Sequence, residues 1–131
     1  MSTDPSIHIV RSNLGRARGL GSAKTGLHHW WMQRITAVAL LPLSLYFVLT
    51  VLMLDHSTRE QVALFMAEPW NAVLYLCLIA ALFYHLSLGV QVVLEDYVHS
   101  EGLRMASILL VNGAIVFCAL ACAVSILKLA L

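Results

Sequence analysis

Three long stretches without a charged side chain run through this 131-residue sequence. They cover residues 35–54, 72–94 and 107–127, and all fifteen Asp, Glu, Lys and Arg residues lie outside them. A helix rises about 1.5 Å per residue, so each stretch is long enough to cross the roughly 30 Å hydrocarbon core of a bilayer. Because hydrocarbon offers no partner to backbone N–H and C=O groups, each stretch is expected to be helical. The sequence therefore predicts an all-α membrane protein with three transmembrane helices.

Composition narrows the function classes further. Hydrophobic residues make up 60% of the chain and charged residues 11%, against about 25% charged residues in soluble domains. With a formal net charge of only +1, this excludes a soluble globular enzyme, a disordered tail and a nucleic-acid binder with a broad basic face. The cysteines lie inside apolar runs and form neither a zinc-binding spacing nor a secreted disulfide framework: Cys77, Cys118 and Cys122.

The basic residues predict an orientation. Most of them precede the first span: Arg11, Arg16, Arg18, Lys24 and Arg34. Arg104 lies between the second and third spans, whereas Arg59 and Lys128 fall on the opposite side. The excess of basic residues marks the cytoplasmic side. We therefore expect a multi-pass membrane protein with a cytoplasmic N-terminus and its C-terminus on the opposite side of the membrane.

The same pattern divides the chain into a cytoplasmic N-terminal segment, residues 1–34, and a membrane anchor, residues 35–131. Trp30, Trp31 and Trp70 flank the spans, as interfacial anchors do. Pro42 lies inside the first span and is expected to bend that helix without ending it. The first apolar run begins at residue 35 and is a full span long, so no cleaved signal peptide is expected. Three helices enclose little volume, and we expect partner helices from another subunit.

One histidine, His85, lies inside a predicted span, and ionisable side chains at membrane depth are often functional. Small residues share its helical face at i±4 spacing: Cys77, Ala81 and Gly89. They leave room for a flat group against the backbone, as an axial haem ligand requires. The same spacing also suits close helix packing around a hydrogen-bonded histidine, and both interpretations stay open. A bis-histidine haem would need its second ligand from another subunit, because the chain has no other histidine at that depth.

Small residues also line one face of the third span: Ala114, Cys118, Cys122 and Ser125. We interpret this face as a packing seam rather than as a site of cysteine chemistry. Asn112 is polar and lies inside the same span, where it can bridge two helices or contact a ligand. Packing is the favoured interpretation.

Polar residues gather where the second span ends. Asp96 lies eleven residues after His85, on the same helical face and about 16 Å along the axis, and Tyr97 follows it. A phenol is a suitable donor to a quinone carbonyl, and a nearby carboxylate can orient it or carry protons. Solvation of the carboxylate and interfacial anchoring of the tyrosine are the alternative roles.

Before the first span, His28, His29 and Arg34 are expected near the same membrane surface. Such cations can pair with lipid headgroups or with carboxylates such as haem propionates. Pairing with lipid headgroups is the favoured interpretation from the residues alone.

Two runs resemble a known family. HLSLGVQVVLEDYV, residues 85–98, resembles the signature of the small membrane-anchor subunit of succinate dehydrogenase (complex II), and GLGSAKTGLHHWWMQRITAVALLP, residues 19–42, is similar to the N-terminal part of alphaproteobacterial members. The resemblance implies that His85 is an axial ligand of haem b and that Tyr97, supported by Asp96, hydrogen-bonds ubiquinone. It also implies that His28 and Arg34 approach the haem propionates, whereas the role of His29 is left open.

The resemblance further implies a bacterial inner membrane, with the C-terminus in the periplasm, and a complex in which other subunits oxidise succinate. The partners would be a flavoprotein, an iron–sulfur subunit and a larger cytochrome b anchor that shares the haem. This chain has neither cysteine spacing for a cluster nor a Gly-rich dinucleotide fingerprint, so it is not expected to be catalytic alone. The alternatives are a cofactor-free structural anchor and the anchor of a fumarate reductase working in reverse. A proton-path or transporter subunit is disfavoured, because no span contains a carboxylate.

Overall fold

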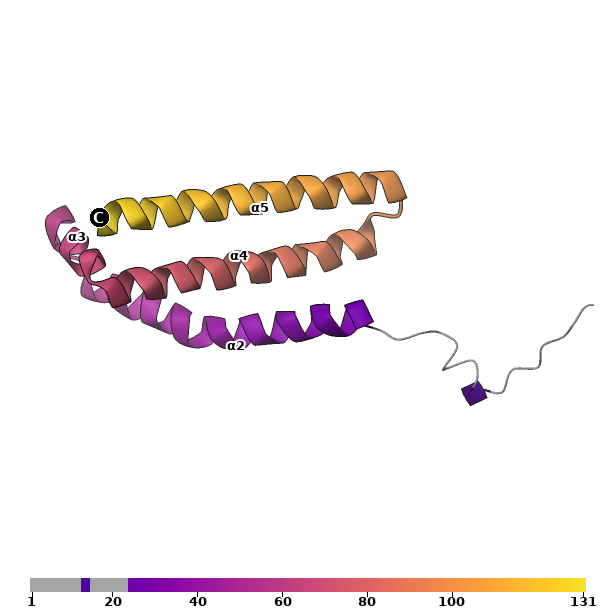
Figure 1. Cartoon of the computed structure of the whole chain (residues 1–131), viewed down its shortest axis with the longest axis horizontal. Coiled ribbons are helices and arrows are strands. Elements are labelled where there is room, and N and C mark those ends of the chain that lie inside the picture. The colour runs from indigo at the N-terminus through magenta and orange to yellow at the C-terminus, as the bar shows by residue number, and fades with distance from the viewer. Residues whose placement is uncertain (1–12, 15–23) are drawn as a thin grey trace, which may run out of the picture.

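A computed structural model describes residues 13–14 and 24–131 of the chain, and the described part is helical apart from short connections. Its main elements are α2 (Lys24–Met53), α3 (Arg59–Ala67), α4 (Pro69–Tyr97) and α5 (Glu101–Ala130). Three of them, α2, α4 and α5, are long and apolar enough to cross a membrane (Figure 1). The prediction of an all-α protein with three membrane-spanning helices is confirmed.

The helices extend past the apolar stretches that predicted them. α2 begins at Lys24, eleven residues before the predicted span, and α4 and α5 each exceed their predicted spans at both ends. An apolar run marks only the part of a helix that lies in hydrocarbon. The helical backbone can continue on both sides into the polar headgroup layer. α2 also continues through Pro42, and its axis changes direction part-way along its length (Figure 1).

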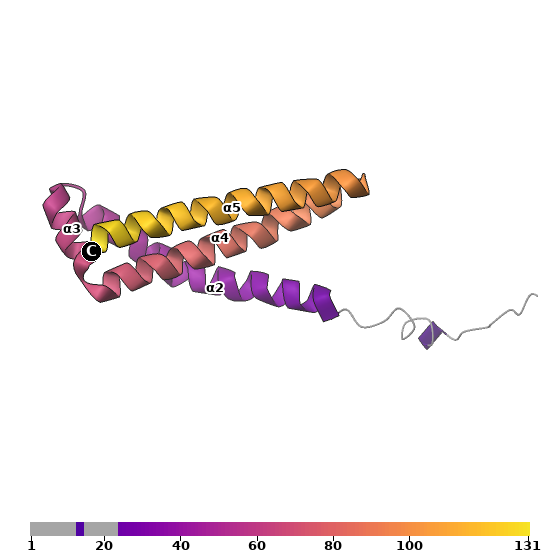
Figure 2. The same cartoon turned by 45° about the horizontal axis from the view of Figure 1, so that its top comes forward.

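The helix α4 lies in the middle of the arrangement. It packs against α2 on one side and α5 on the other, and within the described helices the backbones of α2 and α5 do not come close to each other. The start of α2, the end of α4 and the start of α5 lie at one end of the bundle, and α3 and the C-terminus lie at the other (Figure 1). Figure 2 shows that α2 diverges from α4 towards the end where α2 begins.

Polar side chains connect α4 to both neighbours. Tyr46 of α2 donates a hydrogen bond of 2.6 Å to Asn71, and the hydroxyls of Thr50 and Tyr75 lie 2.7 Å apart. On the other side, Ser87 donates to Oδ1 of Asn112 in α5 at 2.7 Å. Asn112 thus bridges two helices, as the packing interpretation of this residue predicted.

The small residues of the predicted packing seam on the third span are exposed in this chain, and the seam stays a prediction. Ala114, Cys118, Cys122 and Ser125 are all exposed. The half-buried stripe that faces α4 is offset from them and runs instead through residues such as Ile108, Ile115 and Ala119. Small residues favour close approach, but the larger isoleucines and the Ser87–Asn112 bond fix which face of α5 meets α4.

The helix α3 lies in the connection between the first two predicted spans, where the sequence analysis predicted no helix. It packs against α4 and α5 and begins with a capping box: the Thr58 hydroxyl accepts from the Gln61 N–H, while the Gln61 side chain accepts from the Thr58 N–H. Pro69 then starts α4 at a position that tolerates proline. The Thr-x-x-Gln pattern at residues 58–61 is the sequence signal that could have revealed this helix.

We expect Thr58→Ala to destabilise α3 by about 1 kcal/mol, because it removes the side-chain acceptor that satisfies a free N–H in the first turn. Amide hydrogen exchange in detergent or nanodiscs measures this as faster exchange across residues 59–67 with unchanged protection of α4. Ser57→Ala is the matched control, because the Ser57 side chain makes no hydrogen bond to another described residue. Equal exchange in both variants would contradict the capping role.

Candidate functional site

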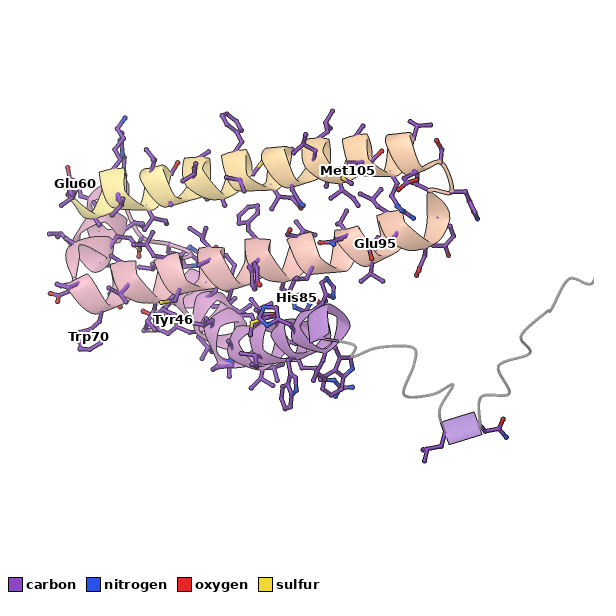
Figure 3. The ribbon with its side chains drawn as sticks, turned by 45° about the vertical axis from the view of Figure 1, so that its right-hand side comes forward. Tyr46, Glu60, Trp70, His85, Glu95 and Met105 are labelled. Carbon is purple, nitrogen blue, oxygen red and sulfur yellow. The ribbon has the colours of Figure 1, made fainter. Side chains whose placement is uncertain are left out.

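His85 projects from α4 towards α2, near the middle of the described bundle (Figure 3). Both ring nitrogens meet side chains of one turn of α2. Nδ1 lies 2.9 Å from the hydroxyl oxygen of Thr36, and Nε2 lies 3.3 Å from the amide nitrogen of Gln33. The imidazole is therefore fixed in orientation by two polar groups of the first predicted span and the residues just before it.

Thr36 is one of the few buried side chains, with 8% of its surface exposed. Its hydroxyl also lies 2.7 Å from the carbonyl oxygen of Met32 and 3.1 Å from that of Gln33. Hydroxyls in helices commonly donate to a carbonyl of the preceding turn. Thr36 thus connects the backbone of α2 with the ring of His85.

A cleft of about 580 Å³ opens between α2 and α4 beside this pair. Its lining residues are Gly26, His29, Trp30, Gln33, Gly89, Gln91, Val92 and Glu95. Two polar atoms at this end of the helices, Nε2 of His29 and Oε1 of Gln33, are buried without a hydrogen-bond partner among the described residues. Buried polar atoms are usually paired, so the α2–α4 cleft offers unsatisfied groups to a ligand.

The two cationic residues predicted to face haem propionates lie outside this lining. His28 is exposed, and His29 is the histidine that lines the α2–α4 cleft. Arg34 is also exposed, and its guanidinium lies 4.2 Å from the ring centroid of Trp30. Since Trp30 itself lines the cleft, Arg34 is at the rim rather than inside it.

The carboxylates at the end of α4 take different positions. Glu95 lines the α2–α4 cleft and accepts a hydrogen bond of 2.8 Å from Gln91. Asp96 is exposed and is absent from the lining, and Tyr97 is 78% exposed at the last position of α4. Figure 3 places Glu95 at the end of α4 far from Trp70. Asp96 and Tyr97 are therefore exposed at the end of α4, outside the lining of the cleft.

A comparison with protein families identifies the chain. Residues 9–123 match the model of the succinate dehydrogenase/fumarate reductase transmembrane subunit. The chain belongs to this family. It is 36% identical over 102 residues to a succinate dehydrogenase hydrophobic membrane anchor subunit of Rickettsia bellii, which covers 78% of this chain and 82% of that protein.

Other relatives carry similar names. The succinate dehydrogenase membrane anchor subunit of Reclinomonas americana is 30% identical over 113 residues, or 84% of this chain and 85% of that protein. The hydrophobic membrane anchor subunit of Paracoccus denitrificans is 30% identical over 93 residues, or 71% of each chain. The resemblance drawn from residues 19–42 and 85–98 is thus confirmed at the level of the family.

The residues around His85 fit a haem of the kind expected for this family. A neutral imidazole nitrogen is a common ligand of haem iron. Nε2 of His85 lies 3.3 Å from the Gln33 amide nitrogen, and Gln33, unlike His85, lines the cleft. Gly89 also lines the cleft, and a Cβ there would lie 3.6 Å from the Gln33 amide nitrogen, so the Gln33 side chain lies over the glycine. Among the described residues, no cluster of three or more metal-binding side chains competes for this role.

The sequence analysis left the role of His29 open and missed Gln33 and Thr36. These three residues form the face of α2 that meets His85 or the cleft. Their spacing of four and three residues places them on one side of a helix. A polar stripe leading into an apolar span is the signal that could have found them, because lipid would not solvate it.

Proposed function

We propose that the chain is the membrane-anchor subunit of a succinate:ubiquinone oxidoreductase. The family match over residues 9–123, together with three membrane-spanning helices, carries this proposal. The partners are a flavoprotein subunit, an iron–sulfur subunit and a larger cytochrome b anchor. Succinate oxidation takes place on those partners, and this chain contributes membrane attachment, one haem ligand and part of a ubiquinone site.

His85 is the proposed axial ligand of a haem b shared with the larger anchor. The proposal is supported by the position of the imidazole between α4 and α2 and by the adjacent unpaired atoms of His29 and Gln33. A bound haem supplies a one-electron redox centre. The basic groups near the cleft, His28, His29 and Arg34, are suited to bind its propionates through charge-assisted hydrogen bonds.

Tyr97 is the proposed hydrogen-bond donor to a ubiquinone carbonyl, and Asp96 is proposed to orient it. Support comes from their adjacent positions at the end of α4, where both side chains are exposed. A quinone carbonyl gains negative charge as it is reduced, and a phenolic O–H can stabilise that charge. The distribution of basic residues supports placing this end of the bundle on the cytoplasmic side.

A cofactor-free anchor is the second candidate function. One observation favours it: both nitrogens of His85 have polar neighbours in α2, as a histidine that only packs would have. This candidate predicts a complex with flavin and iron–sulfur centres and no haem.

The deciding experiment is a dithionite-reduced-minus-oxidised visible spectrum of the intact complex, isolated through a tag on this chain. We expect a sharp b-type α band together with flavin and iron–sulfur absorbance, and succinate-dependent reduction of ubiquinone. Flavin and iron–sulfur signals without the α band would support the cofactor-free anchor. An intact, partner-bearing complex without any chromophore would refute both candidates, and preferential fumarate reduction would identify the reverse enzyme.

A further inference from the structure

The hydrogen bonds of Thr36 decide which nitrogen of His85 carries the proton. A threonine hydroxyl has one proton to donate and two lone pairs with which to accept. The hydroxyl oxygen lies closer to the Met32 carbonyl, at 2.7 Å, than to Nδ1 of His85, at 2.9 Å. Since a carbonyl can only accept, the Thr36 proton goes to the backbone. The bond to His85 then requires an N–H on Nδ1, with the threonine oxygen accepting.

The second ring nitrogen follows from the first. A neutral imidazole carries one proton, so Nε2 of His85 has a free lone pair when Nδ1 is protonated. The Gln33 amide nitrogen, 3.3 Å away, is a donor and matches that lone pair. This contact is long for an N–H···N hydrogen bond, and the other end of the same amide, Oε1, has no partner among the described residues. Gln33 is therefore held weakly and can leave Nε2 at small cost.

We propose that Thr36 is a positioning residue that holds His85 as the Nδ1–H tautomer, with Nε2 presented for iron. The inference rests on the proposed function, in which His85 binds haem. Histidine ligands usually donate their other ring N–H to a fixed acceptor, which sets the tautomer and ring orientation and raises the basicity of the ligating nitrogen. Thr36 meets this requirement because it is buried and anchored to the α2 backbone.

An electronic consequence follows. An acceptor on Nδ1–H pushes electron density towards Nε2, and a more basic ligand stabilises ferric over ferrous iron. Without that acceptor, the haem is bound more weakly and its midpoint potential becomes more positive. A threonine that only filled space between α2 and α4 would change neither quantity when replaced by a side chain of the same shape.

The test compares three variants of the intact, tagged complex. Thr36→Val keeps the shape and removes the acceptor, whereas Thr36→Ser keeps a hydroxyl. Thr50→Val is the matched control, because Thr50 is also buried in α2, also donates to its own helix, at the Phe47 carbonyl, and also contacts an α4 side chain, Tyr75. The readouts are haem per flavin, the rate of haem transfer to an apoprotein acceptor, the low-spin ferric EPR g-values and the haem midpoint potential.

We expect Thr36→Val to lose haem about 10- to 100-fold faster, to shift the low-spin g-values and to raise the midpoint potential. Thr36→Ser should restore all three towards wild type, and Thr50→Val should leave them unchanged. If Thr36→Val prevents assembly, Thr36→Ala removes the acceptor without crowding and is compared with Thr36→Ser in the same way.

Two results would overturn the inference, and they differ in what they say about the proposed function. If His85→Ala abolishes low-spin haem while the variants that lack the Thr36 hydroxyl match wild type in haem retention, g-values and potential, His85 remains the ligand and the role of Thr36 is refuted. If His85→Ala itself keeps the wild-type low-spin spectrum, His85 is not the ligand, and the assignment of Thr36 fails together with that part of the proposed function.

Discussion

Replacing His85 by alanine is expected to abolish the low-spin haem b signal of the complex while flavin and iron–sulfur centres remain. The imidazole lies inside the span of α4 and faces α2, and the loss of an axial ligand converts a six-coordinate haem into a high-spin or empty site. Visible and EPR spectra of the purified complex, normalised to flavin, measure the change. The expected loss is nearly complete.

The control for this result is His99→Ala, because His99 is exposed just beyond the end of α4. Adding free imidazole sharpens the test, since a small base that enters the space left by the side chain should restore low-spin haem in His85→Ala. A normal low-spin spectrum in His85→Ala without added imidazole would remove this residue as the ligand. A loss of flavin as well would indicate failed assembly, in which case the isosteric His85→Gln variant is examined instead.

The second large effect is expected at Tyr97. Tyr97→Phe keeps the ring and removes the O–H that is proposed to donate to ubiquinone. Loss of one hydrogen bond to the reacting carbonyl should lower kcat/KM for ubiquinone by about tenfold, while succinate-dependent reduction of a soluble dye that accepts electrons before the membrane subunits stays unchanged. Steady-state kinetics with ubiquinone and with the dye separate these two activities.

Tyr84→Phe is the matched control for Tyr97→Phe. Tyr84 also belongs to α4 and is exposed, and its hydroxyl has no hydrogen-bond partner within the residues that the structure describes. Its replacement should leave both activities at wild-type values. Unchanged ubiquinone kinetics in Tyr97→Phe would contradict the role of Tyr97 as a donor and leave it as an interfacial anchor. Glu95, the carboxylate that lines the cleft, would then be the next residue to replace.

Hydropathy predicted the three spans well because the bilayer imposes a simple rule on composition and length. It could not predict α3, whose nine residues are too short and too polar to register as a span. Its start depends on the local exchange of hydrogen bonds between Thr58 and Gln61. The faces of the helices were also harder to predict than the helices themselves. The exposed small residues of α5 show that several faces of one span can look suitable for packing.

The candidate site was predictable in part. His85 stood out because a lone histidine in an apolar run is costly, but its neighbours in α2 are 49 and 52 residues away in sequence. Helical spacing relates residues on one helix and says nothing about which turn of a second helix will lie opposite. Helical spacing places Asp96 on the same face of α4 as His85. It does not tell which carboxylate at the end of α4 lines the cleft with α2, and that carboxylate is Glu95.

The course of α2 through Pro42 has a mechanical consequence. Side chains fasten this helix to α4 on both sides of the proline: Thr36 at His85, and Thr50 at Tyr75. Proline removes one backbone hydrogen bond between these two attachments. The helix α2 therefore bends most easily at this point. The segment before Pro42, which bears Gln33 and Thr36, can then change its angle to accommodate a bulky group. The segment after Pro42 keeps its contact with α4 through Thr50 and Tyr75. Pro42 thus divides α2 into an adjustable segment beside His85 and a fixed segment beside α3.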